Sequence, residues 1–171
     1  MPLLGVEPLV NAFKAYVLAN AAAKATALNA EYADSVALTA PVAVYISERQ
    51  IASVPAYPVA FVMALRERTD VWSINGAGGA QTKPLARLRI GLMDRSAAGD
   101  ADELERKKWR YARLMKELLI EAESADALAG HHLGTGEPTF ELEWSDNIVS
   151  GSFMVSGFAM DVEFNHSEAK S

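Results

Sequence analysis

Apolar and charged residues alternate along four short segments between Arg66 and Glu163. Two of the segments carry arginines on every second position and two carry carboxylates; the charged residues are Arg66, Arg68, Arg87, Arg89, Glu141, Glu143, Asp161 and Glu163. Because successive side chains of a β-strand point to opposite faces, this alternation predicts one sheet with an apolar face and a charged face. Such a charged face suits contact with a partner, or internal ion pairing, better than catalysis.

Two longer segments have the spacing of amphipathic helices. The first is predicted over about residues 7–29 and the second over about residues 101–123. Asp100 and Glu103 match a capping box, with Asp100 as the N-cap acceptor and Glu103 reaching back to its amide. Glu103 also forms a favourable i,i+4 pair with Lys107 on the exposed face. The residues predicted to be buried on the second helix are Leu104, Tyr111, Met115, Leu118, Leu119 and Ala122.

The remaining elements between the helices are predicted to be strands. Residues 42–46 alternate in polarity, and residues 59–65 are apolar on both faces, which predicts a central strand covered on both sides. Residues 75–80 are rich in glycine and give a strong turn signal, because glycine tolerates positive φ. We therefore predict a long hairpin over about residues 59–94, with its tip near Gly78.

This hairpin would bring the two arginine rows together, with Arg66 near Arg89 and Arg68 near Arg87. Like charges opposed across a sheet are unfavourable unless a negative group intervenes. The carboxylates on the neighbouring strands of the same chain are one source of that charge, and acids of another subunit are the other. Exposed pairs contribute only about 0–1 kcal/mol each. The energy of any assembly must then come from apolar area, and the charges would set its register.

The order helix, strand, long hairpin, helix, two strands predicts an α+β fold. We expect a mostly antiparallel sheet of about five strands with two main helices packed on one face. A single domain is predicted over residues 1–171, with flexible termini at about 1–6 and 165–171 and a projecting hairpin loop at about 74–83. Gly157 predicts a bulge in the last strand.

Composition argues against several classes of function. The net charge of −6 disfavours a general nucleic-acid binder, but it permits a protein that lets DNA pass without gripping it. The chain has no cysteine, which removes disulfides, thiol nucleophiles and Cys-based zinc sites. No apolar run approaches the roughly 18–20 residues of a membrane-spanning helix. We expect no secretion signal, because no basic region precedes the first apolar residues.

Three patterns resemble sites of chemistry, and we favour a structural interpretation of each. Residues 76–83 are similar to a phosphate loop, but threonine, lysine and proline at 82–84, followed by a strand pattern, indicate a hairpin tip. His131 and His132 would point opposite ways on an extended segment, so we predict exposed loop histidines and no metal site. An acid–base pair of carboxylates would need a cleft that splits the two pKa values, whereas regular alternation of the acids on strands predicts a solvated or ion-paired sheet face. We expect no catalytic residue, no cofactor and no enzymatic activity.

Five segments in this order resemble the tail terminator, or tail-completion, proteins of long-tailed bacteriophages. The resemblance covers most of residues 7–164, and it is one of layout. Its parts are the first amphipathic helix, Tyr57-Pro58-Val59-Ala60-Phe61-Val62, Leu88-Arg89-Ile90-Gly91-Leu92, Trp109-Arg110-Tyr111-Ala112-Arg113-Leu114, and Gly157-Phe158-Ala159-Met160-Asp161-Val162-Glu163-Phe164.

The resemblance implies a structural protein of the virion tail and neck, made in the host cytoplasm. Similar proteins form a homo-oligomeric ring, usually hexameric, that caps the tail tube protein, ends tail elongation and joins the tail to a head–tail connector or stopper protein. DNA passes through the lumen without specific binding, and no membrane or cofactor takes part. The sheet and the first helix would supply subunit contacts, and the hairpin loop would reach the tube or connector. The implied contact residues are Arg66, Arg68, Gly76, Gly78, Gly79, Lys83, Arg87, Arg89, Glu141 and Glu143.

Three alternatives remain open from the sequence. A related head–tail connector or head-completion protein shares the ring logic but binds on the portal side. A bacterial protein of a phage-derived tail device would have the same sequence features. The alternative from another class is a small enzyme with a cleft around His131, His132 and Glu141.

Overall fold

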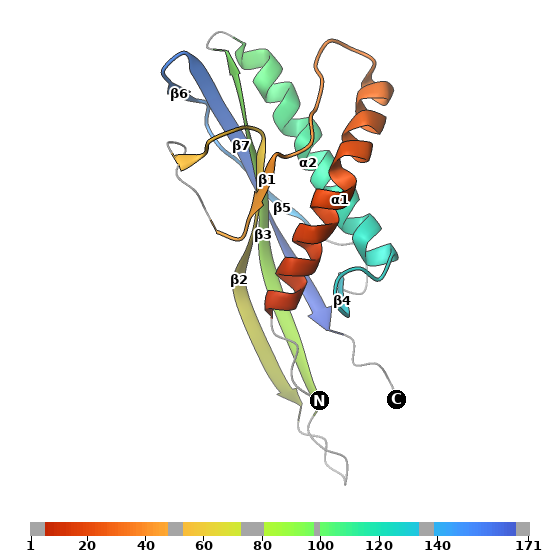
Figure 1. The fold of residues 1–171 in the computed structure, drawn as a ribbon. Helices are drawn as coiled ribbons and strands as arrows, with labels where there is room; N and C mark the ends of the chain where they lie inside the picture. Colours follow the sequence, from red (N-terminus) through yellow and green to blue (C-terminus); the bar gives the residue numbers. More distant parts are fainter. Residues whose placement is uncertain (1–5, 48–52, 73–80, 98–99, 134–138, 167–171) are drawn as a thin grey trace.

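A computed structural model describes residues 6–47, 53–72, 81–97, 100–133 and 139–166, with the backbone alone at 67–72, 81–85 and 165–166. The described residues form an α+β fold, as predicted (Figure 1). Its elements, in chain order, are α1 (Val6–Tyr32), β1 (Ala43–Tyr45), β2 (Val59–Trp72), β3 (Gln81–Ala97), α2 (Ala101–Ser124), β4 (His131–Leu133), β5 (Glu141–Trp144), β6 (Ile148–Ser150) and β7 (Phe153–His166).

The strands form one mixed sheet in the order β1-β2-β3-β7, and β4, β5 and β6 all pair with β7. These three short strands follow one another along the far edge of β7, so the sheet is five strands wide. The β1–β2 pair is parallel, and every other pair is antiparallel. The prediction of a mostly antiparallel sheet of about five strands is therefore confirmed.

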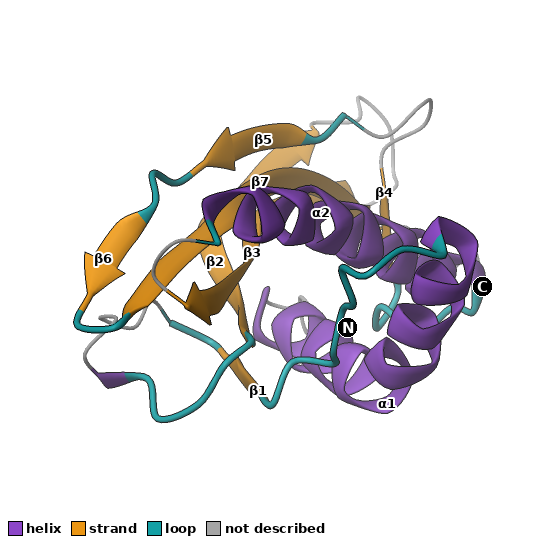
Figure 2. Ribbon diagram, turned by 90° about the horizontal axis from the view of Figure 1, so that it is seen from above, coloured by secondary structure: helices purple, strands orange, loops and turns teal. Residues whose placement is uncertain are grey.

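Both helices cover one face of the sheet, and the sheet curls around α2 (Figure 2). The core lies between these layers, where apolar residues of α1, β3 and β7 meet those of α2. All six apolar residues predicted to be buried on α2 are less than 2% exposed; they are Leu104, Tyr111, Met115, Leu118, Leu119 and Ala122. Helical periodicity alone was enough to identify this face, because it depends only on the local geometry of the helix.

The capping box predicted at the start of α2 does not form. The Asp100 side chain makes no capping hydrogen bond, and only the Asp100 carbonyl accepts the amide of Leu104, at 3.1 Å. Glu103 instead binds Lys107 at 2.6 Å, which confirms the predicted i,i+4 pair. Lys107 is largely buried, because its ammonium also lies 3.9 Å from the carboxylate of Asp94 on β3. This contact with a buried acid places Lys107 next to the sheet, so Lys107 is not on an exposed face.

The β2–β3 hairpin forms, but its register differs from the predicted one. Arg66 lies opposite Arg87, and Arg89 lies opposite Met63. The pairing shifts between Ala64 and Arg66, so Leu65 is an extra residue in β2. An alternating sequence pattern does not reveal a bulge of this kind, because the extra residue only shifts the pairing of the residues that follow it.

Two predicted boundaries also move. Residues 81–83 belong to β3, where they pair with residues 70–72, so the predicted loop at 74–83 is shorter by these three positions. The rest of that loop, at 73–80, lies outside the described residues. Residues 165 and 166, predicted to be part of a flexible terminus, end β7 and pair with β3 or β4.

The central strand β2 is covered on one face only, which corrects the prediction of cover on both. Ala60 and Val62 are fully buried under the helices, but Leu65 is 44% exposed. Both helices lie on one side, so the opposite face of the sheet stays open. Val44 in β1 is buried, whereas Val42 and Ile46, which flank this three-residue strand, are each 57% exposed.

Gly157 does not mark a bulge in β7. It pairs with Met93 in an uninterrupted β3–β7 register. The irregularity is in the opposite strand, where residues 145–147 lie across from 156 and 157. A Cβ atom on Gly157 would lie 2.3 Å from the carbonyl oxygen of Leu92, so this position needs glycine because the backbones approach closely.

Candidate functional site

The open face of the sheet carries the charged rows that the sequence predicts. Arg87 and Arg89 project from β3, the middle strand, and Glu141 and Glu143 project from β5 beyond β7. Leu88 and Ile90 alternate with these arginines on β3, point the other way and are fully buried in the core. The period of two therefore places these four charges on one surface.

Asp161 on β7 connects the two rows. Arg89 donates two hydrogen bonds to Asp161, from Nε to Oδ1 at 2.7 Å and from Nη2 to Oδ2 at 3.1 Å. Arg87 bridges Asp161 at 3.1 Å and Glu141 at 2.5 Å, and Arg89 lies 3.5 Å from Glu143. We call these five side chains the charge network. They are paired within one chain, so the carboxylates that neutralise these arginines come from the same subunit.

The members of the charge network differ in burial. The side chain of Asp161 is 10% exposed, whereas those of Glu141 and Glu143 are 69% and 71% exposed. Hydrogen bonds from Arg89, followed by the charges of Arg89 and Arg87, lower the pKa of Asp161 despite its burial. A carboxylate held ionised in this way is a poor proton donor near neutral pH. The network thus fits a structural role better than acid–base chemistry.

The other predicted contact residues lie along the same hairpin. Arg66 is exposed on β2 opposite Arg87, and Arg68 is paired through its backbone with Leu85. Lys83 lies in β3 opposite Asp70. The three predicted contact glycines, Gly76, Gly78 and Gly79, are outside the described residues. Among the predicted contact residues whose side chains are described, Arg87, Arg89, Glu141 and Glu143 are brought together through Asp161.

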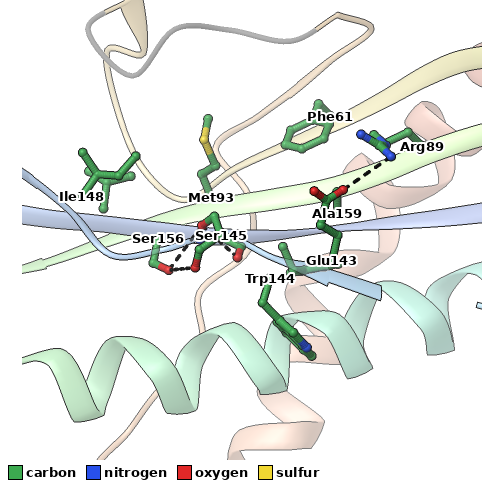
Figure 3. Close-up of a pocket in the computed structure, with 12 residues that line it drawn as sticks. Phe61, Arg89, Met93, Glu143, Trp144, Ser145, Ile148, Ser156 and Ala159 are labelled. Carbon is green, nitrogen blue, oxygen red and sulfur yellow. Dashed lines mark hydrogen bonds and ion pairs between the residues drawn. The ribbon is translucent and has the colours of Figure 1, made fainter. Parts of the chain in front are cut away.

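A groove of about 280 Å³ adjoins the charge network on the open face (Figure 3). One strand register crosses it, from Phe61 to Gly91 to Ala159 to Glu143. Small residues form its floor, and its apolar lining includes Phe61, Met93 and Ile148. The sequence patterns do not reveal this groove, because its residues come from β2, β3, β5, β6 and β7 and meet only when the register is known.

The polar end of the groove is tied to α2. Ser145 accepts the amide of Gly157 at 2.7 Å, and its hydroxyl lies 3.4 Å from that of Ser156. Lys108 reaches in from α2 and donates to Glu105 at 2.7 Å and to the Ser145 carbonyl at 3.1 Å. Its buried ammonium has these acceptors and therefore holds the β5–β6 junction against the helix.

The prediction of exposed loop histidines was wrong, because both residues lie in strand β4 and only His132 is partly exposed. His131 lies in β4 and is 2% exposed, with Nδ1 3.2 Å from the carbonyl oxygen of Leu128. It is buried because β4 pairs with the end of β7 under α2. His132 is partly exposed on the other side of the strand. Within the described ranges, no group of three or more histidine, aspartate or glutamate side chains is placed to hold a metal ion.

Large apolar side chains are exposed on several elements, and the sequence patterns did not single them out as surface. Trp109 and Ile120 on α2 are 58% and 42% exposed. Together with Leu142 and Trp144 of β5 they line a second, shallow groove on the helix side. The alternation along β5 predicts that its apolar residues face the helices, but the strand lies at the margin of the sheet and α2 covers it only in part.

Neither described helix is long and apolar enough to span a membrane. No protein-family model matches the chain, and a search of curated proteins found no significant match. The function proposed below is therefore based on the described geometry and on the order of the elements predicted from the sequence.

Proposed function

We propose that this protein is a structural subunit of a long-tailed bacteriophage. In this proposal its copies form a ring that caps the tail tube, ends tail elongation and joins the tail to the head connector. The observation that carries the proposal is the β2–β3 ribbon, which extends beyond the rest of the sheet (Figure 1). The resemblance in layout to tail terminator proteins supports the same reading.

At its outer end the ribbon has no other described strand beside it. Pairing of β3 with β7 ends at Leu85, and β1 ends opposite Phe61. Four further rungs, from Thr69 opposite Pro84 to Trp72 opposite Gln81, belong to β2 and β3 alone. A two-stranded ribbon is only marginally stable in water. Docking against another protein would stabilise it, as expected of a subunit that works in an assembly.

The surface composition supports association as well. Among the described residues, twelve large apolar side chains are at least 36% exposed. The central arginines of the open face are already paired with carboxylates of the same chain. Apolar area is therefore the available source of assembly energy, and the exposed acids Glu141 and Glu143 are placed to affect register and specificity.

The proposed mechanism is steric, and no bond is made or broken. A head-to-tail interface between identical subunits closes into a ring when its rotation is right. A closed ring that binds the tube end on one face presents a different face to solvent, so no further tube subunit adds. The tail then stops growing when the closed ring binds the last ring of tube subunits.

Deletion of residues 76–80 tests the proposal directly. We expect the deleted protein to fold and to assemble, because these residues lie beyond the last described rungs of the hairpin. We expect it to fail in capping purified tail tubes or in joining them to heads, as judged by electron microscopy of tube length and head attachment.

The matched control replaces the same five residues with a glycine–serine segment of equal length, which separates loop length from loop sequence. Tubes of normal length that still attach to heads after the deletion would contradict the assigned role of the loop. Wild-type protein that stays monomeric alone and also with tube ends would overturn the proposed function itself.

A further inference from the structure

The sheet has an exposed edge strand at each end, β1 on one side and the β5–β6 pair on the other (Figure 2). Among the described strands, β1 pairs only with β2, and β5 and β6 pair only with β7. Edge strands present backbone donors and acceptors to other chains, and proteins usually protect them with charges, proline or a covering segment.

Both edges expose apolar residues, although the edge strands are short and Pro41 precedes β1. Val42 and Ile46, which flank β1, are each 57% exposed, and β1 itself contains no charged residue. On the opposite edge, Ile148 and Val149 of β6 are 48% and 64% exposed, again without a charge in the strand. The acids of the adjoining β5 are engaged by arginines of the open face.

The two edges lie at the same height in the sheet. A single register runs across all five positions, from Tyr45 on β1 through Phe61, Gly91 and Ala159 to Glu143 on β5. Their directions are also compatible. Because β1 is parallel to β2 and each later pair is antiparallel, β5 and β6 run opposite to β1.

We propose that the β5–β6 edge of one copy pairs with the β1 edge of the next copy, in antiparallel orientation. The sheets of neighbouring subunits then form one continuous β-layer, in which the exposed apolar residues of each edge cover those of the other. The two edges are at opposite ends of the sheet, so the contact is head-to-tail and passes from copy to copy until the ring closes. This inference rests on the proposed ring, for which it names the interface.

The absence of cysteine allows a clean test by cross-linking. Val42→Cys and Val149→Cys are both at exposed positions and leave the core unchanged. We expect the double variant, treated with a short bismaleimide, to give a ladder of covalent multimers on a denaturing gel, while each single variant stays monomeric. A dimer from Val149→Cys alone would indicate a two-fold contact between β6 strands and would overturn the inference.

A second pair of variants tests the edge without cross-linking. Val149→Lys places a charge on the exposed edge, and we expect it to weaken self-association at least about tenfold in sedimentation velocity. Val149→Thr, which keeps a β-branched side chain, should associate like the wild type. Rings that form normally with Val149→Lys and give no cross-link would place the interface elsewhere while the proposed function stands. Absence of any wild-type ring would remove both.

Discussion

Gly91 shows how closely the open face of the sheet is packed. A Cβ atom at this position would lie 2.2 Å from Cζ of Phe61 and 2.5 Å from the carbonyl oxygen of Phe158. The ring of Phe61 thus occupies the space that any other residue would need. Because Gly91 has no side chain, the ring of Phe61 can pack against β3, and this packing helps to form the groove.

We expect Gly91→Ala to lower the free energy of unfolding by about 1–3 kcal/mol, because the added methyl group must displace both the ring and a backbone carbonyl. Denaturant unfolding followed by circular dichroism measures the change. Adding Phe61→Leu should restore only part of the loss, since the Phe158 carbonyl remains in place. An unchanged midpoint in Gly91→Ala would show that β3 can move aside at little cost.

At the same scale, Asp161 is the most buried member of the charge network, with a side chain that is 10% exposed. Because its pKa is lowered in the folded protein, its contribution is complete above the unfolded pKa and is lost as the pH falls through the folded pKa. We expect Asp161→Asn to destabilise the fold by about 1–3 kcal/mol at neutral pH, since two arginines lose the negative charge and one of the two acceptor oxygens of a largely buried partner.

Glu141→Gln is the matched control for that substitution, because Glu141 is 69% exposed and binds the same Arg87. Its effect should stay within about 0.5 kcal/mol. The measurement is equilibrium unfolding of both variants at neutral pH and again under acid conditions. Equal losses in the two variants would mean that burial does not decide the strength of these pairs.

At the scale of elements, the connection between α1 and β1 is held against α2 by polar contacts. Buried Arg110 pairs with the carboxylate of Asp34 and donates to the carbonyl of Val36, and its guanidinium lies 4.0 Å from the ring centre of Tyr32. Tyr111 donates to the Thr39 carbonyl and accepts its amide, both at 3.1 Å. Asn29 of α1 also exchanges two hydrogen bonds with the backbone of Leu38, so polar contacts from both helices hold this segment.

Asp34 makes this contact dependent on pH. The hydrogen bonds from Arg110 and from the Val36 amide lower its pKa from 3.8 to about 2. A depressed folded pKa means that the carboxylate stabilises the fold above pH 3.8 and that this contribution is lost as the pH falls toward 2. We expect the carboxyl resonance of Asp34 to titrate near this value in NMR spectra.

In Asp34→Asn, the part of the acid-induced loss of stability that belongs to this carboxylate should be absent, so unfolding should depend less on pH below pH 4. Asp102→Asn, a change at an exposed acid in the first turn of α2, serves as the control. A titration of Asp34 at the ordinary value of 3.8 would show that the pair with Arg110 is not maintained in solution.

At the scale of the whole molecule, the placement of both helices on one face decides what the protein presents to others. The covered face buries the apolar alternation of β3 and β7, and the open face keeps the charge network and the groove. The two apolar edges and the projecting ribbon remain at the margins. A molecule built in this way offers contact surfaces on several sides, which suits a subunit between like copies and unlike neighbours.

The sequence by itself determined the two helices, the strands other than β4 and β6, and the face of each that carries charge. Periods of 3.6 and 2 arise from local backbone geometry, so Leu118 and Arg89 could be assigned to a face without knowing their neighbours. Tertiary structure alone decided that Leu65 bulges, that Arg66 faces Arg87 and that His131 is buried. Register, edges and burial depend on contacts between residues far apart in the chain, and such contacts leave no periodic mark in the sequence.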